Sequence, residues 1–364
     1  MSTVAKSQIQ FDASGFQSFI DGSDDPDWLI EGRKAAWKQF EALDWPGQKD
    51  EEWMRTDIRL FKLDKFAMPS ECNQPLPASV FNTGVELGGH CHSHDGISVG
   101  AEVDPDLASK GVLFGNARQL LAEHSDTLKP YFHRAFDQNF DRFSALHAAF
   151  WSSGAILFVP RGVVVEKPLH LFSAMSDGGV DLSHTLVILE DGAEATVLAE
   201  CQSPNVDASG MHCGGIELIV GDNAHLRYVN LQDWGQGVWH FGHQKAIVGK
   251  DSSLQWTAGA LGSRLSKVNQ HVDRNGSQLP SQRRTVHRKQ AASLLPHIAT
   301  PPRRTLRQRL PLQGSFARHI AYGLARNDQG RRRSSKNRRL PAKRQLVALD
   351  SSPRRFDSRI GDRS

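Results

Sequence analysis

A repeat of about 30 residues in the second half of the chain constrains the fold more than any other feature. Each repeat has a polar turn after an apolar triplet and before alternating apolar and polar residues. The turns begin 30, 31 and 28 residues apart, at Pro160-Arg161-Gly162, Glu190-Asp191-Gly192, Gly221-Asp222-Asn223 and Gly249-Lys250-Asp251. Two turns and two strands in so short a unit leave no room for the helix of a strand–helix–strand unit. No helical periodicity interrupts residues 155–270, so the repeat predicts a solenoid of strands rather than a doubly wound sheet.

We therefore predict a mainly β protein in which residues 154–272 form a parallel β-helix of about four coils. A β-sandwich is the alternative, and the regular spacing of the turns favours the β-helix. Equivalent corners are expected at Gly162, Gly192, Asn223 and Asp251, because these residue types tolerate left-handed backbone.

Residues 1–153 predict a separate N-terminal helical region with a loop and strand segment. Asp25-Pro26-Asp27 offers an N-cap with proline just inside a helix, and a second helical segment is expected at 51–57. Apolar positions with helical spacing predict packing as a helix bundle. The expected order is helices in 24–66, loops with short strands in 67–105 and helices in 116–151.

The charge of the chain changes abruptly near residue 272. The formal net charge of the 364 residues is +4, but Asp273 to Ser364 holds 23 Lys and Arg, 5 Asp and no Glu, a net charge of +18. Met1 to Val272 carries a net charge of −14 and contains all eight Trp and all four Cys. High net charge without apolar periodicity is typical of disorder. Residues 273–364 are therefore predicted to be an Arg-rich, disordered tail.

The sequence also bears on the compartment in which the protein works. No apolar run reaches the ~18 residues that span a bilayer, and the first 25 residues resemble neither a signal peptide nor an Arg-rich transit peptide. Four cysteines in a chain of this length do not form a disulfide framework. We expect a cytoplasmic protein with no membrane partner.

Two short motifs contain residues that could ligate a metal. Cys91-His92-Ser93-His94 offers ligands that suit zinc or iron, but it lacks a second Cys/His pair and reads as a loop flanked by glycine. Met211-His212-Cys213-Gly214 follows Cys201 on the predicted β-helix, where a small buried thiol is expected rather than a cluster or persulfide site. We therefore predict no metal site in either motif.

The remaining candidate residues also predict a protein without catalytic machinery. His240 and His243 flank Phe241-Gly242 and alternate with apolar positions, so they are expected to face solvent or a partner. The sequence contains no P-loop, no dinucleotide-binding glycine motif and no paired carboxylates. We predict no catalytic residue, assign no cofactor-binding residue, and expect a non-enzymatic scaffold.

The basic tail also fits a different class, a β-solenoid protein that binds nucleic acid. Arg331-Arg332-Arg333 and Arg338-Arg339 could neutralise phosphates. Aromatic residues that stack on bases are few in the tail, namely Phe316, Tyr322 and Phe356. Nucleic acid is therefore the less favoured partner, and a non-native disordered peptide is preferred. A β-helix enzyme acting on carbohydrate is disfavoured because neither a secretion signal nor an acidic cluster is visible.

Several motifs within residues 24–272 resemble the SufB/SufD family of iron–sulfur cluster assembly proteins. In chain order they are Ala36-Trp37, Glu51-Glu52-Trp53, Thr56-Asp57, Phe61, Asp141-Arg142-Phe143-Ser144-Ala145-Leu146-His147, Val159-Pro160-Arg161-Gly162-Val163, Glu166-Lys167-Pro168-Leu169-His170-Leu171 and Gly259-Ala260-Leu261-Gly262-Ser263-Arg264-Leu265-Ser266-Lys267. Those near the N-terminus resemble the SufD branch. The resemblance implies a helical region followed by a right-handed parallel β-helix, in agreement with the repeat.

The resemblance also implies a function and partners. It implies a subunit of a cytoplasmic scaffold complex with the SufB paralogue and the SufC ATPase, which assembles iron–sulfur clusters from sulfide, iron and electrons. An iron–sulfur cluster would be held transiently by the complex, SufC would supply the ATPase activity, and association of two copies stays open. The family's functional Cys and His positions lie in its C-terminal segment. Residues 273–364 do not match that segment, so no such position is assigned here.

A shift of the reading frame would explain the tail. Codons compatible with residues 289–302, 325–333, 335–349 and 356–364 spell family-like sequence in the family's order when read one base later. An Arg-rich, Glu-free composition with a sharp start is also what out-of-frame reading of a GC-rich gene produces. We hypothesise that translation is out of frame from about Asp273. The last coils and C-terminal helices, which carry the family's partner surfaces, would then be missing and the scaffold impaired.

Overall fold

The computed structural model describes residues 8–69, 76–81 and 84–274, together with the backbone of 282–289. It is mainly β, and a β-solenoid of about four turns is its main feature. A short two-stranded sheet pairs β1 (Ile9–Gln10) with β2 (Ala67–Met68). The helices are α1 (Ala13–Asp21), α2 (Asp27–Ala42), α3 (Pro105–Ser109), α4 (Ala117–Glu123), α5 (Ser125–Leu128) and α6 (Arg142–Phe150), with a 3-10 turn η1 (Leu63–Lys65).

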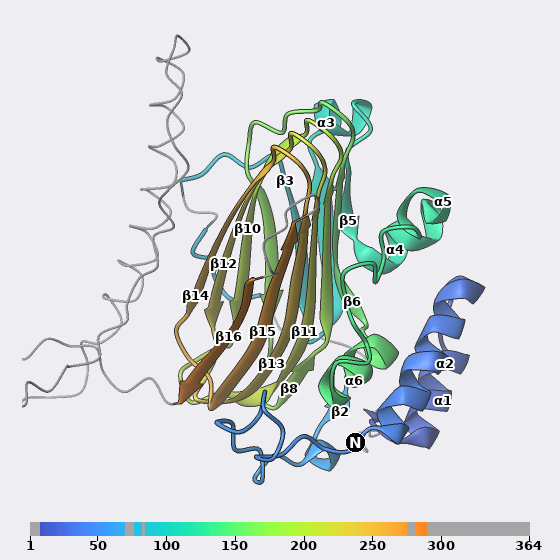
Figure 1. Cartoon of the computed structure of the whole chain (residues 1–364), viewed down its shortest axis with the longest axis vertical. Coiled ribbons are helices and arrows are strands. Elements are labelled where there is room, and N and C mark those ends of the chain that lie inside the picture. The colour runs from blue at the N-terminus through green and yellow to red at the C-terminus, as the bar shows by residue number, and fades with distance from the viewer. Residues whose placement is uncertain (1–7, 70–75, 82–83, 275–281, 290–364) are drawn as a thin grey trace, which may run out of the picture. The chain divides into compact units, whose positions relative to one another are not determined.

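Two larger sheets form the walls of the solenoid (Figure 1). The six-stranded sheet has the order β14 (Ser253–Ala260), β12 (His225–Asp233), β10 (Glu194–Gln202), β7 (Leu169–Ala174), β3 (Gly89–His94) and β4 (Ile97–Val103). The eight-stranded sheet has the order β16 (Gln282–Lys289), β15 (Leu265–Arg274), β13 (Gly237–Val248), β11 (Ser209–Val220), β9 (Ser183–Leu189), β6 (Ser153–Val159) and β5 (Leu113–Asn116), and β8 (Gly179–Asp181) pairs with β11 beside this path. Strands of successive coils pair in parallel.

The predicted corner column is confirmed. Gly162, Gly192, Asn223 and Asp251 all have positive φ, of 70°, 72°, 56° and 53°. The amide of each of the first three donates to the turn of the next coil: Gly162 N to Asp191 O at 3.0 Å, Gly192 N to Asp222 O at 2.8 Å and Asn223 N to Lys250 O at 2.8 Å. These residues therefore occupy one column of left-handed corners, where glycine, asparagine and aspartate cost least.

Apolar side chains from both walls fill most of the solenoid interior. Alternate residues of a strand point to one face, and here the inward positions of each strand stack on those of its neighbours. The cluster includes Leu157, Val187, Leu218 and Ala246 from the eight-stranded sheet, facing Leu169, Val197, Leu226 and Tyr228 from the six-stranded sheet.

The helices cover the outer face of the eight-stranded sheet instead of forming a bundle of their own (Figure 1). All residues of α6 from Phe143 to Phe150 are buried, because α6 lies between α2 and β11. The fully buried Arg33 on α2 donates to the carbonyls of Ala149 and Trp151, at 3.2 and 2.8 Å, and pairs with Asp25 at 2.9 Å. A cation at a helix C-terminus also opposes the negative end of the helix dipole. The helical periodicity was predicted correctly, but its apolar face packs on a sheet.

Several N-terminal expectations differ from the structure. The segment 51–57 forms turns rather than a helix, and α1 was not predicted. Pro26 is itself the N-cap of α2, and its side chain has no acceptor for the first amides of the helix. The neighbouring Asp25 does not cap the helix either, because its carboxylate pairs with Arg33 and Arg118. Three strands of the N-terminal segment are part of the solenoid walls: β3 and β4 belong to the six-stranded sheet and β5 to the eight-stranded sheet.

Most of the predicted disordered tail lies outside the described residues. Asp273 and Arg274 end β15. The other described stretch of the tail, β16, runs antiparallel to β15, from Leu265↔Lys289 to Val272↔Gln282. The parallel coil-to-coil order of this wall therefore stops at β15.

Glu217 joins the helical layer to the sheet beneath it. Its carboxylate has no exposed surface and accepts the backbone N–H groups of His133, Ala135 and Phe136 at 2.8, 2.6 and 2.8 Å. It also contacts His184 Nε2 at 3.0 Å. Burial alone would raise the pKa of Glu217, but the His184 contact and these N–H groups lower it below its ordinary value.

A chain of buried imidazoles continues from this carboxylate. His184 Nδ1 lies 2.9 Å from His147 Nε2, and His147 Nδ1 lies 2.8 Å from the carbonyl oxygen of Cys213. All three contacts are hydrogen bonds together only when one of the two imidazoles carries both of its ring protons. Removing one partner of a buried ion pair is strongly destabilising, because the other charge stays buried without compensation.

Replacing Asn223 by valine should test the corner column. A β-branched residue is strained at φ 56°, so Asn223→Val should lower the free energy of unfolding by about 1–2 kcal/mol, whereas Asn223→Gly should change it little. Urea unfolding followed by circular dichroism measures both. The matched control is His225→Val, also exposed but on the adjacent strand, and an equal loss there would argue against the corner assignment.

Removing the charge of Glu217 should be far more costly than removing an exposed one. Glu217→Gln turns an NH₂ group toward backbone donors and leaves His184 without its carboxylate, so stability should fall by about 3–5 kcal/mol. Glu194→Gln, at an exposed position of β10, should stay within about 0.5 kcal/mol of the wild type. Comparable urea midpoints for the two variants would contradict the role given to Glu217.

Candidate functional site

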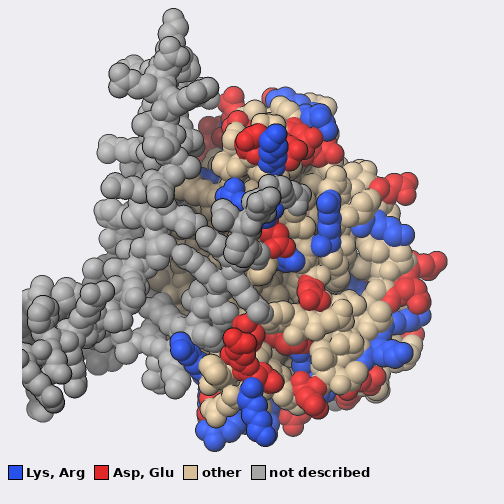
Figure 2. Space-filling view, in the orientation of Figure 1, with Lys and Arg blue, Asp and Glu red and all other residues tan. Residues whose placement is uncertain are grey.

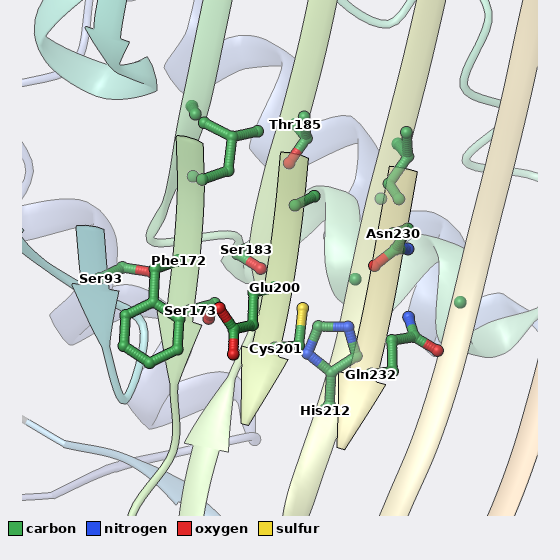
Figure 3. A pocket seen from close by; sticks show the side chains of 18 of the residues that line it. Ser93, Phe172, Ser173, Ser183, Thr185, Glu200, Cys201, His212, Asn230 and Gln232 are labelled. Carbon is green, nitrogen blue, oxygen red and sulfur yellow. The ribbon is translucent and has the colours of Figure 1, made fainter. Parts of the chain in front are cut away.

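One end of the solenoid interior is polar, in contrast to the apolar remainder. A cavity of about 50 Å³ lies there between the two walls (Figure 3). Its lining includes Ser93, Ser173, Ser183, Cys201, His212, Asn230, Gln232 and His240. A volume of this size is enough for a few water molecules and too small for an organic substrate.

A polar row that includes the cavity-lining His212 and His240 follows directly from the strand register. Asp181, His212, His240 and Ser266 are successive register partners across β8, β11, β13 and β15. His212 Nδ1 lies 3.0 Å from Asp181 Oδ2, and His240 Nδ1 lies 2.9 Å from Ser266 Oγ. The two imidazole rings are 5.0 Å apart. In-register stacking therefore brings two histidines and a carboxylate together although they are about 30 residues apart in sequence.

Glycines next to this row make space for the imidazoles. A Cβ at Gly214 would lie 2.5 Å from His212 Nε2, and one at Gly242 would lie 3.4 Å from His240 Nε2. A side chain at Gly214 would thus displace the His212 ring, whereas a Cβ at Gly242 would only come into contact with His240. The facing wall supplies Cys201 and Gln232, which also line the cavity (Figure 3).

Burial holds the ionisable groups of the cavity in unreactive states. It raises the pKa of the Cys91 thiol to about 12 and also raises that of Cys201, where Asp181 and Glu200 add to the effect. A thiol that stays protonated is a poor nucleophile and a poor metal ligand. Burial would raise the pKa of Asp181 as well, but hydrogen bonds from His212, Ser173 and Ser183 lower it instead. The geometry favours hydrogen bonding over thiolate chemistry.

Asn230 gives the cavity spare acceptor capacity. Its Oδ1 is buried without a hydrogen-bond partner among the described residues, and Asn230 lines the cavity. Buried acceptors of this kind are normally satisfied by water or another small polar guest. The cavity is therefore suited to small polar molecules.

The structure places the predicted motifs in unexpected ways. Cys91-His92-Ser93-His94 was expected to be a loop but forms β3, so its residues alternate between the two faces of the sheet. Cys91 packs in the apolar interior and Ser93 lines the cavity. In the second motif, Met211 and Cys213 are buried against the helical layer while His212 points into the cavity.

The expectation that His240 and His243 face solvent was wrong. His240 is 1% exposed inside the solenoid, and His243 is 8% exposed on the opposite face of β13. There His243 Nε2 lies 3.1 Å from Asp141 Oδ1, at the N-cap of α6. Alternation with apolar residues predicts one solvent-exposed face of the strand, but both faces of this wall are covered.

The sequence interpretation missed the buried carboxylates. Asp181, Glu200 and Glu217 are each at most 2% exposed. The available signal was their position: Glu200 and Glu217 interrupt apolar strand segments, where a charge is retained only if it is paired.

The described residues also set limits on the chemistry. No group of three or more His, Cys, Asp and Glu side chains among them is arranged to hold a metal ion, and no helix in the described part is long and apolar enough to cross a membrane. Figure 2 shows acidic and basic side chains interspersed over the described surface on that face. This surface lacks the single-sign patch typical of nucleic-acid binding.

His240 should make folding sensitive to mild acid. Gln232 Nε2 lies 3.4 Å from His240 Nε2 and needs an unprotonated acceptor there, and burial together with His212 holds the pKa of His240 well below its usual value. Below about pH 6.5 the unfolded chain binds a proton at this residue and the folded chain does not, so stability falls as pH falls.

Replacing His240 by glutamine should therefore flatten the pH dependence. From about pH 6 to 5, the wild type should lose about 1 kcal/mol more than His240→Gln, because one proton fewer is taken up on unfolding. Urea titrations at several pH values measure this difference. His225→Gln, which changes an exposed histidine, should keep the wild-type slope. Parallel slopes for wild type and His240→Gln would show that His240 is protonated in the folded state.

Comparison with known proteins agrees with this architecture. The SufBD protein N-terminal region matches residues 17–171, and the SufBD core domain of SUF system FeS cluster assembly matches residues 172–291. "Iron-sulfur cluster assembly SufBD family" proteins of Staphylococcus saprophyticus and Staphylococcus haemolyticus are each 26% identical over 260 residues, and one of Staphylococcus aureus is 25% identical over 259 residues.

These alignments cover 67% of this chain for the first two relatives and 66% for the third. The chain spans only 55% of the length of each of these relatives. The matches run through both the helical layer and the solenoid, so they concern the whole described fold. The chain belongs to the SufBD family of iron–sulfur cluster assembly proteins.

Proposed function

We propose that the chain is a SufD-type scaffold subunit of a SUF complex rather than an enzyme. The observation that carries this proposal is the state of its buried groups. The thiols of Cys91, Cys201 and Cys213 all have raised pKa values because they are buried. A solenoid whose interior thiols are unreactive is suited to presenting its outer surfaces to other proteins.

The partners in this proposal are the SufB paralogue and the SufC ATPase, in the cytoplasm. Family membership supports a role beside other SUF components. SufC would supply ATP hydrolysis, since the sequence has no P-loop. An iron–sulfur cluster would then belong to the complex and not to this subunit alone.

We also propose that the chain as written is impaired by a shifted reading frame from about Asp273. The family match ends at residue 291, within the Arg-rich segment that begins at Asp273. At the same point β16 pairs antiparallel to β15, whereas a further coil would pair in parallel. On the other wall β14 is the edge strand, with Leu254 and Trp256 only partly buried. An unpaired edge and an open apolar interior favour aggregation.

The reading frame can be tested directly. Resequencing genomic DNA across codons 268–276 should reveal an inserted or deleted base. An intact frame in an independent read would remove this part of the proposal, and the tail would have to be treated as native.

Co-expression tests the scaffold role. The chain as written and a frame-corrected version would each be expressed with SufB and SufC and analysed by size-exclusion chromatography and visible absorbance. The frame-corrected protein should co-elute with both partners and support an iron–sulfur absorbance band, and the chain as written should do neither. Equal complex formation would place the partner surfaces within residues 1–272.

A nucleic-acid binding assay tests the alternative class, a β-solenoid protein that binds nucleic acid. Fluorescence anisotropy with a labelled duplex should show that any affinity of the chain as written falls steeply with salt and is lost on truncation after Val272. Sequence-specific binding that persists at physiological salt would instead favour the nucleic-acid-binding class.

A further inference from the structure

Three histidines lie together on the outer face of the six-stranded sheet, opposite the interior cavity. His90 and His92 occupy alternate positions of β3, and His170 on β7 is the register partner of His90. The rings of His90 and His92 are 4.5 Å apart, and those of His92 and His170 are 5.4 Å apart. We call His90, His92 and His170 the outer histidine cluster.

The tautomer of His170 is fixed by its surroundings. Ser79 Oγ donates its only proton to Glu200 Oε2 at 2.6 Å. Its oxygen can therefore only accept from His170 Nε2, which is 3.3 Å away. Glu200 Oε2 itself lies 3.6 Å from the same nitrogen. A proton of His170 is thus held on Nε2, and in the neutral imidazole Nδ1 carries the lone pair.

That lone pair points at a second imidazole nitrogen. His170 Nδ1 and His92 Nε2 are 3.4 Å apart. Two imidazole nitrogens bound to one tetrahedral ion at 2.0–2.1 Å are separated by about 3.3–3.4 Å. The distance already matches shared coordination of one ion, which would replace the hydrogen bond between the two rings.

The carboxylate behind His170 is itself firmly held. Glu200 is 2% exposed and accepts the backbone N–H of Val80 at 2.9 Å. Burial would raise its pKa, but contacts with His170, Ser79 and Val80 lower it, so it stays ionised. A carboxylate behind a histidine that points its other nitrogen outward is the usual outer shell of a protein metal site.

The cluster is accessible to an ion from solvent. His90 and His92 are half-buried, whereas His170 is fully buried. An ion would therefore approach from the side of His90 and His92.

We propose that His92 Nε2 and His170 Nδ1 bind a divalent first-row transition-metal ion on the outer face of the sheet, with His90 as third ligand. As the side chains stand, no three ligands in the described part of the chain converge on one position, so His90 must rotate toward the ion. Imidazole ligands suit Zn²⁺, Cu²⁺, Ni²⁺ and Fe²⁺. The proposal does not depend on the scaffold function, because the isolated chain carries all three ligands.

Cobalt binding to untagged protein tests the site. Co²⁺ should bind one ion per chain with visible d–d absorbance, and Zn²⁺ should displace it. His92→Gln removes a ligand and should weaken Co²⁺ binding at least 10-fold. Glu200→Gln keeps the ligands but weakens their support, so a 10- to 100-fold loss is expected. His225→Gln, an exposed histidine outside the cluster, should bind as the wild type does.

Folding effects can be separated from ligand effects. Circular dichroism and urea midpoints identify any variant that fails to fold, and Ser79→Ala replaces Glu200→Gln if the latter does. Weaker binding by folded His92→Gln with an altered d–d band supports the site. Binding that is absent in the wild type, exceeds one ion per chain, or is unchanged in His92→Gln would overturn it.

Discussion

In-register parallel pairing of successive coils is the constraint on which the rest of this structure depends. The repeats differ in length, yet their strands stay aligned. The strands that follow a corner, β10 and β12, are both nine residues long, and the strands that follow the far connection, β11 and β13, are both twelve. The difference lies in the far connections, residues 203–208 in one coil and 234–236 in the next. Variation in length is therefore confined to loops, and both walls keep one register.

That register decides the chemistry of every strand position. Inward positions stack into columns that are apolar at one end and polar at the other, where Asp181, His212 and His240 follow one another. A polar column in an interior is tolerated only when its members pair with one another. The glycines at 214 and 242 complete the column by leaving space for the rings. The cavity thus follows from the coil geometry and needs no dedicated loop.

The sequence was sufficient to predict the solenoid because its signal is local and repeated. A corner needs a residue that tolerates positive φ. Such a residue occurs at four equivalent positions, namely Gly162, Gly192, Asn223 and Asp251. The burial of His240 and His243 could not be predicted in the same way. That of His240 depends on the facing wall of the solenoid, and that of His243 on the segment around Asp141, which covers the sheet from far away in sequence. The turns at 51–57 replaced a predicted helix for a similar reason: Trp53 is 2% exposed and stacks on Phe143 of α6. Tertiary packing there outweighs local helical propensity.

The alternation of a strand also separates two kinds of chemistry across a single sheet. On β3, Cys91 faces the closed interior, where burial keeps its thiol protonated, while His92 faces outward beside His170. The same alternation on β10 places Cys201 at the cavity and Glu200 behind the outer histidines. The thiols of Cys91 and Cys201 are thus held inside and protonated, and the histidines on the outer face are supported by the buried carboxylate of Glu200. A solenoid wall one strand thick can therefore insulate one chemistry from the other without a domain boundary.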